Sequence, residues 1–187
     1  MKTVVLDPGH GGSQPGAASD GLVEKALALS IAQKVAAELA EHGVRVLLTR
    51  QTDTTVDIDA RPKVAAKHHA DIFLSIHANA ASSPAARGAE AWFRSGSKED
   101  ATFTRTLLHK IAGYEPSIPL RGAFPDDTNR HGRLGVLHGH LPTTRAALLE
   151  IGFLTNKQDR MVITGERYPQ ALAKAILAIL QMAPVKE

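Results

Sequence analysis

The segment VVLDPGHGG, residues 4–12, is the stretch of the chain that decides the fold. Thr3 to Leu6 form an apolar and β-branched run, which predicts a short buried strand. Pro8 and Gly9 end that strand, so His10 falls in the glycine-rich turn that follows it. Ligands of open parallel α/β sheets bind beyond the carboxyl ends of the strands, which makes His10 a candidate functional residue.

The composition is that of a globular protein with one core. The chain has 187 residues, of which 43% are hydrophobic and 22% are charged, so a single domain over residues 1–187 is expected. The net charge of +3 suits an anionic polymer as partner, but no Lys and Arg run indicates a nucleic-acid tract. The absence of cysteine excludes disulfides, a thiolate nucleophile and a Cys-type zinc site.

The composition and the N-terminal sequence also bear on location. No apolar run reaches the length of a membrane span, so no spanning segment is expected. Only Met1 and Lys2 precede the first expected strand, so no signal peptide is expected within this chain. Nothing in the sequence demands more than a monomer.

Hydrophobic periodicity predicts strands and helices in alternation. Strands are expected at about 3–6, 44–49, 72–76, 88–93, 134–137 and 146–149, and helices at about 22–42, 59–69, 99–112 and 170–181. Ser19 or Asp20 is expected to cap the first helix, residues 114–133 to form a long surface loop, and residues 156–159 to form a turn. The alternation predicts an α/β fold: a single domain with an open, mostly parallel, twisted sheet of about six strands and helices on both faces.

Four chemically capable side chains are expected at one edge of this sheet. His10, His77 and Glu150 each follow an apolar strand, and the carboxyl ends of parallel strands share an edge. Glu24 opens the first helix on its apolar side, at the same edge. Two histidines and one carboxylate suffice for a catalytic zinc that keeps its fourth position for water. A second carboxylate close by can act as general base.

Each of these residues taken alone also has a purely structural explanation. His10 can hydrogen-bond within its turn, His77 can be a satisfied core histidine, and Glu24 can favour the positive end of the helix dipole. Glu150 is harder to explain in this way, because an unpaired buried carboxylate costs several kcal/mol or shifts its pKa strongly upward. The four residues together favour the metal site. His42, His68, His69 and His109 are expected at the surface, and His131, His138 and His140 in loops that border the cleft.

Several motifs in this order resemble one known family. They are LDPGHGG at residues 6–12, Glu24 before an amphipathic helix, TRQTD at 49–53, ADIFLSIHAN at 70–79, GAE at 88–90 and LEIGFLTN at 149–156. Together they resemble the zinc-dependent N-acetylmuramoyl-L-alanine amidases of type 3, which are peptidoglycan hydrolases with an open α/β sheet. The resemblance covers nearly the whole chain.

The resemblance implies a role for each candidate residue. His10, Glu24 and His77 correspond to the ligands of one zinc ion per chain, and Glu150 corresponds to the essential catalytic glutamate. Asn79 and Arg61 are expected to bind substrate. The implied reaction is cleavage of the amide bond between the lactyl group of N-acetylmuramic acid and the L-alanine of the stem peptide. The implied partner is peptidoglycan, and the implied site of action is the cell wall outside the cytoplasmic membrane, for an autolysin or an endolysin.

Two departures from the family pattern concern the surroundings of the site. His138 stands where the family carries an arginine, which affects the expected substrate contacts of that loop. Some members carry an inserted helix that plugs the active site, but only about forty residues separate Phe93 from Leu134 here. We therefore expect an open site, with no side chain from residues 94–133 on the metal.

Other functional classes are compatible with parts of this pattern. A zinc peptidase that cuts within the stem peptide would use the same scaffold and metal. A non-catalytic wall-binding module would keep the fold but would have no need of Glu150. A nucleophilic hydrolase is disfavoured because the chain has no cysteine and no Gly-x-Ser-x-Gly elbow, and the glycines at 9, 11 and 12 are not followed by the Lys of a phosphate-binding loop.

Overall fold

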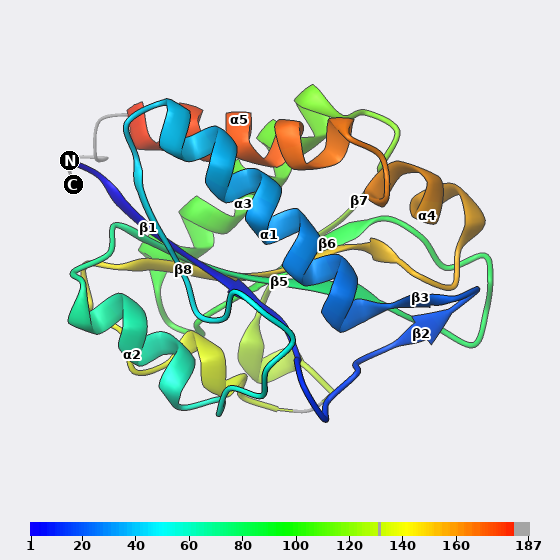
Figure 1. Ribbon diagram of the computed structural model, residues 1–187, viewed down its shortest axis with the longest axis horizontal. Helices are drawn as coiled ribbons and strands as arrows, with labels where there is room; N and C mark the ends of the chain where they lie inside the picture. Colours follow the sequence, from blue (N-terminus) through cyan, green and yellow to red (C-terminus); the bar gives the residue numbers. More distant parts are fainter. Residues whose placement is uncertain (131, 182–187) are drawn as a thin grey trace.

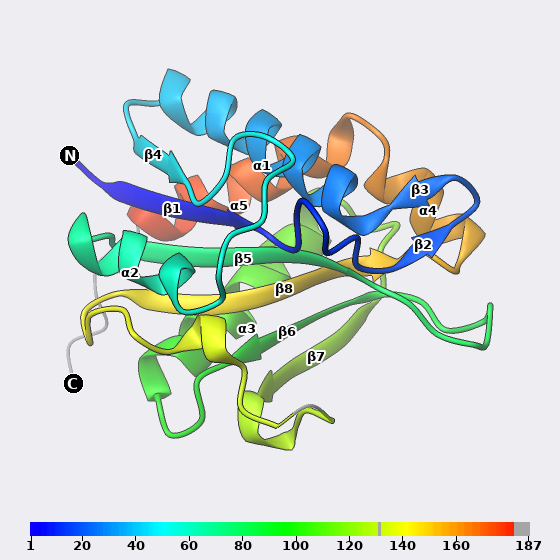
Figure 2. The same ribbon diagram turned by 60° about the horizontal axis from the view of Figure 1, so that its bottom comes forward.

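The structure, a computed structural model, describes residues 1–130 and 132–181. Its centre is a six-stranded sheet (Figure 1) in the order β4-β1-β5-β8-β6-β7, which can be followed in Figure 2. The strands are β1 (Thr3–Pro8), β4 (Arg45–Leu48), β5 (Ile72–Asn79), β6 (Ala89–Phe93), β7 (Leu120–Pro125) and β8 (Arg145–Phe153). Strands β4, β1, β5 and β8 run parallel, whereas β6 is antiparallel to β8 and parallel to β7. The expected α/β class and mostly parallel sheet are confirmed.

Helices cover both faces of the sheet (Figure 2). One face packs against α1 (Glu24–Glu41), α3 (Lys98–Tyr114) and α5 (Arg167–Gln181), which share the larger hydrophobic core. The other face packs against α2 (Ala60–Lys67) and the short 3₁₀ helix η2 (Gly135–Leu137), around a smaller core that contains Phe73 and Leu148. His77 and Glu150 lie on this second face, because they alternate in register with Phe73 and Leu148 along β5 and β8.

The central elements follow from the sequence. Val4, Val5 and Leu6 have no exposed surface, because a parallel strand covered on both faces buries side chains of both orientations. The residues of α1 at four-residue spacing, Leu27, Ile31, Val35 and Leu39, are all buried as expected.

Several local expectations were wrong. Residues 120–125 form strand β7 rather than a loop, and residues 135–137 form η2 rather than a strand. Strand β7 contains Gly122 and Pro125 and lies at the sheet edge, where such residues are tolerated because one side of the strand is unpaired. His131 lies outside the described residues.

The elements flanking the first and last helices also differ from expectation. A hairpin of β2 (Ala18–Ser19) and β3 (Leu22–Val23) precedes α1, so Val23 is the N-cap and neither Ser19 nor Asp20 caps the helix. Residues 157–163 form helix α4 (Lys157–Ile163), whose first turn is capped by the Asn156 side chain, rather than the expected turn. None of the described helices is long and apolar enough to cross a membrane.

Glu150 lies inside its strand, not at its end. Strand β8 continues to Phe153, three residues beyond Glu150, and β5 continues two residues beyond His77. The two residues are direct partners in the parallel pairing of β5 with β8. Their side chains therefore lie beside each other on the sheet face, near its carboxyl edge.

Candidate metal centre

Three side chains from separate elements converge on one point. His10 comes from the loop after β1, Glu24 is the first residue of α1, and His77 belongs to β5. Glu24 Oε1 lies 3.1 Å from His10 Nε2 and 2.9 Å from His77 Nδ1. One nitrogen or oxygen atom from each residue lies within 4.8 Å of the others, so the three can hold one metal ion.

The donor set and its spacing fit zinc. Two imidazole nitrogens and one carboxylate oxygen are a common zinc-ligand set, and tetrahedral ligands at about 2.0 Å from zinc lie about 3.3 Å apart. The two nitrogen-to-oxygen distances of 3.1 and 2.9 Å are close to that spacing. Two of the three pairwise distances in the cluster are thus close to those of a tetrahedral zinc site, and the third is within 4.8 Å.

Glu24 is held as a carboxylate. Its side chain is almost fully buried, and burial by itself would raise its pKa. Hydrogen bonds and charge interactions with His10 and His77 outweigh burial and hold the pKa of Glu24 well below its usual value. The backbone N–H groups of Ala17 and Ala78 also donate to its two oxygens, at 2.8 and 3.1 Å. Glu24 is thus fixed in the ionised form that a metal requires.

Two buried arginines shape the loop that carries His10. Arg50 donates to the carbonyl oxygens of Pro8 and Gly9, at 3.0 and 2.7 Å. Arg61 donates to those of Pro8 and His10, at 2.9 and 2.8 Å. His10 itself has φ of 58°, a left-handed conformation that costs free energy in a residue other than glycine. The arginine contacts hold the loop in this conformation.

Arg61 also pairs with a buried carboxylate. Its Nη1 lies 2.8 Å from Asp7 Oδ1, and the Asp7 side chain has no exposed surface. Asp7 further accepts hydrogen bonds from Thr49 and Ser75. Arg61 is 3% exposed and joins β1, α2 and the His10 loop. These contacts show a supporting role, whereas its expected contact with substrate stays a prediction.

Two glycines allow the ligands to approach the loop. A β-carbon at Gly9 would lie 2.4 Å from Cε1 of His77, and one at Gly16 would lie 2.4 Å from Oε2 of Glu24. Real side chains do not come that close, so any larger residue would displace a candidate ligand. Gly16 also has φ of 70°, which disfavours other residues.

Glu150 stands beside the cluster with an unsatisfied oxygen. Its Oε2 is buried and has no hydrogen-bond partner among the described residues. Burial raises the pKa of Glu150 to about 7, with the charges of Glu24 and Glu90 acting in the same direction and those of His77 and Arg130 opposing it. A carboxyl group with this pKa exchanges protons readily near neutral pH, as a general acid and base must.

Three polar residues next to Glu150 were not assigned a role from the sequence. Glu90 pairs with Glu150 across the antiparallel β6 and β8, and its Oε1 accepts from Asn79 Nδ2 at 2.9 Å. Arg121 Nε donates to the other oxygen of Glu90 at 2.5 Å. Arg130 acts on Glu150 through its charge. The GAE motif places Glu90 in a strand, but only the pairing of β6 with β8 puts it opposite Glu150.

Of the histidines expected to border the cleft, the two that the structure describes, His138 and His140, do not join the ligand cluster. His138 Nε2 lies 2.8 Å from Asp126 Oδ2, in the loop that precedes β8. His140 is 8% exposed and packs its ring 5.7 Å from that of Phe73, and burial lowers its pKa to about 4. His140 is therefore a core histidine of the second face.

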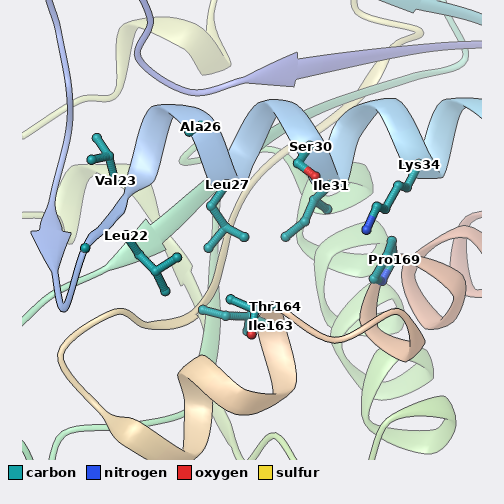
Figure 3. Close-up of a pocket in the computed structure, with 11 residues that line it drawn as sticks. Leu22, Val23, Ala26, Leu27, Ser30, Ile31, Lys34, Ile163, Thr164 and Pro169 are labelled. Carbon is teal, nitrogen blue, oxygen red and sulfur yellow. The ribbon is translucent and has the colours of Figure 1, made fainter.

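Two hollows of the surface lie apart from the three ligands. An apolar groove of about 350 Å³ runs between α1 and the segment joining α4 to α5, with Leu22, Leu27, Ile31 and Pro169 among its lining residues (Figure 3). A polar hollow of about 540 Å³ lies among the β2–β3 turn, residues 81–84 and residues 155–160. Neither hollow is lined by His10, Glu24, His77 or Glu150. The candidate functional site is therefore identified by the chemistry of its side chains and not by the volume of a hollow.

The fold and the cluster define an α/β protein with a candidate metal site at the carboxyl edge of its sheet. The sequence pattern of one family, the N-acetylmuramoyl-L-alanine amidases of type 3, matches residues 4–182, and the chain belongs to this family. It is 31% identical over 177 residues to the amidase LytC of Bacillus subtilis, covering 94% of this chain and 34% of LytC. It is 30% identical over 190 residues to the germination-specific amidase of the same organism, covering 94% of this chain and 76% of that protein.

Solved structures agree with this assignment. The N-acetylmuramoyl-L-alanine amidase of Clostridium difficile 630 superimposes with a TM-score of 0.87 and 29% identity, over 98% of each chain. The catalytic domain of CwlV, an amidase of Bacillus (Paenibacillus) polymyxa, superimposes with a TM-score of 0.84 and 30% identity, over 98% of this chain and 100% of that one. The chain spans only about a third of LytC but the whole of this catalytic domain.

Proposed function

We propose that residues 1–187 form a single amidase catalytic domain that hydrolyses the bond between the lactyl group of N-acetylmuramic acid and L-alanine. The observation that carries this proposal is the pairing of His77 with Glu150 across β5 and β8, beside His10 and Glu24. A three-ligand metal site next to a partly buried glutamate of raised pKa is the arrangement that hydrolysis by activated water requires. Membership of the amidase family supports the choice of bond.

One zinc ion per chain is proposed on His10, Glu24 and His77. Zinc in such a site polarises the substrate carbonyl and lowers the pKa of water. The chain contributes the ionised Glu24 and the two imidazoles in a preformed arrangement held by Arg50 and Arg61. No side chain from residues 94–133 is proposed to block the site.

Glu150 is the proposed catalytic residue. It accepts a proton from the attacking water and delivers it to the nitrogen of the leaving L-alanine. Its pKa of about 7 suits both steps near neutral pH, because neither the acid nor the base form is strongly disfavoured. Asn79, which lies two residues beyond His77 and is partly exposed, is proposed to contact the substrate beside the scissile bond.

The proposed partner is peptidoglycan, and the proposed site of action is the wall outside the cytoplasmic membrane, with the chain acting as a monomer. A net charge of +3 favours contact with an anionic polymer. One similar structure is of the CwlD amidase of Clostridioides difficile in complex with the GerS lipoprotein, at 25% identity. Sedimentation of the purified chain at several concentrations tests the oligomeric state, and a monomer should show a mass that does not change with concentration.

Product analysis of digested peptidoglycan tests the activity and the metal together. Purified peptidoglycan is incubated with the protein alone, with a chelator, and with zinc restored after chelation. The proposal expects stem peptides with a free N-terminal L-alanine, lost with the chelator and regained with zinc. New amino groups from inside the stem would instead establish a peptidase. Binding without any release would establish a wall-binding module.

A further inference from the structure

A chain of three polar side chains leads from the proposed metal site across the sheet. Asn79 Nδ2 donates to Glu90 Oε1 at 2.9 Å, and Arg121 Nε donates to Glu90 Oε2 at 2.5 Å. Both oxygens of Glu90 are thereby used, and Glu90 is 8% exposed. Glu90 is therefore a buried carboxylate that fixes the partly exposed Asn79 and the exposed Arg121 on either side of it.

Arg121 presents its remaining donors to solvent. Its side chain is 42% exposed, and among the described residues its two Nη groups have no hydrogen-bond partner. The guanidinium lies over the ring of Phe153, with Cζ 5.0 Å from the ring centroid. Its Cγ sits close to Gly88, where a β-carbon would lie 3.2 Å from it. Arg121 thus contacts Glu90, Phe153 and Gly88, and the edge of its guanidinium that carries the two Nη groups is open to solvent.

The position of Arg121 relative to Glu150 sets which part of a substrate it can reach. Glu150 on β8 pairs with Glu90 on β6, and Glu90 pairs with Gly122 on the neighbouring β7. Strands lie about 4.8 Å apart, so the backbones of β8 and β7 are about 10 Å apart. An extended peptide covers about 3.3–3.6 Å per residue. If L-alanine, the residue at the cleaved bond, lies beside Glu150, the second or third residue of the stem peptide therefore reaches Arg121.

We propose that Arg121, fixed by Glu90, binds a carboxylate of the stem peptide on the residue that follows L-alanine. This inference rests on the proposed amidase function. An open guanidinium edge matches a carboxylate through two parallel N–H···O bonds, and Arg121 is already ordered before the substrate arrives. Arg121 is accordingly a specificity-determining residue that favours stem peptides with a free carboxylate over amidated ones.

Two synthetic muramoyl dipeptides that differ in one group test the proposal. The residue after L-alanine carries a free α-carboxylate in one and a carboxamide in the other. We expect the wild-type protein to show a kcat/KM at least about tenfold higher for the carboxylate, the worth of one charged hydrogen bond. Arg121→Gln should lose this preference, because its kcat/KM should fall for the carboxylate dipeptide and stay unchanged for the carboxamide. Arg121→Lys should keep part of the preference. Each dipeptide is also measured as an inhibitor of peptidoglycan hydrolysis, so that binding is compared even where cleavage is slow.

Arg105→Gln is the matched control. Arg105 lies on α3 with its guanidinium over the Phe93 ring, at 5.7 Å, on a helix of the opposite face. It should leave the preference intact. An equal kcat/KM of the wild type for both dipeptides would overturn the proposal. An equal fall in kcat/KM for both dipeptides in Arg121→Gln would also overturn it, since Arg121 would then only neutralise Glu90. Failure to release L-alanine-terminated peptides from peptidoglycan would instead overturn the proposed function itself.

Discussion

The imidazole of His77 packs directly against the backbone of Gly9, which directly follows β1, the strand paired with β5, at the edge where the proposed ligands meet. A β-carbon at Gly9 would lie 2.4 to 2.7 Å from three atoms of that ring. We expect Gly9→Ala to push His77 away from Glu24 and to weaken zinc binding by at least about tenfold, as supporting contacts of metal ligands do. Zinc affinity by competition with a fluorescent chelator measures this.

Gly113→Ala provides the control for the same chemical change. Gly113 lies in α3, and a β-carbon there meets no atom within 4 Å. This substitution should leave zinc affinity unchanged and raise the free energy of unfolding by about 0.5–1 kcal/mol, because alanine favours a helix. Equal zinc affinity of the Gly9→Ala protein and the wild type would contradict the assignment of His77 as a ligand.

Glu150 and His77 should separate metal binding from turnover. Glu150→Ala removes the proposed proton carrier but none of the three ligands, so the protein should retain stoichiometric zinc and lose nearly all hydrolysis. His77→Ala removes a ligand and should lose both. Metal content by elemental analysis and release of L-alanine-terminated peptides measure the two properties. A Glu150→Ala protein that keeps most of its activity would show that another group moves the proton.

Glu150 should also make the metal-free protein less stable as the pH rises. The pKa of Glu150 is about 7 in the folded chain and 4.5 as an ordinary carboxyl, so between these values the unfolded chain ionises while the folded chain stays protonated. This difference lowers the free energy of unfolding by about 3 kcal/mol at and above neutral pH.

Glu150→Gln removes that titration. The metal-free variant should match the wild type below about pH 4.5 and become more stable above it, with the gap complete beyond about pH 7. Urea denaturation in the presence of a chelator, at pH 5 and pH 8, measures the gap. Glu41→Gln, at an exposed position at the end of α1, should open no comparable gap. A constant difference at both pH values would contradict the raised pKa.

Arg61 offers a test between support and substrate contact. Arg61→Ala leaves Asp7 as an unpaired buried charge and frees the carbonyl oxygens of Pro8 and His10. We expect the free energy of unfolding to fall by about 3–5 kcal/mol and zinc affinity to fall with it. Unchanged stability and zinc affinity together with a raised KM would instead establish the substrate contact expected from the sequence.

The order of strands β1, β4, β5, β6 and β8 and helices α1, α2, α3 and α5 was predictable because their signals are local. The continuous apolar runs of β1 and β5 and the four-residue spacing in α1 each lie within one segment, and burial on both faces of a parallel sheet explains them. That order alone predicts His10, Glu24 and His77 at one edge. The structure brings them together as expected, and Glu150 differs only in lying inside β8.

The tertiary structure alone decided the surroundings of the site. Strand β7 carries no local strand signal because it contains glycine and proline. The antiparallel direction of β6 depends on its pairing with β8, about sixty residues later in the chain. Those two pairings place Glu90 and Arg121 next to Glu150. The contacts of Arg61 with Asp7 and His10 likewise join positions more than fifty residues apart. The sequence by itself determined which groups can perform the chemistry, because those groups follow strand ends. Folding determined what holds and surrounds them, because side chains distant in sequence meet only when the sheet assembles.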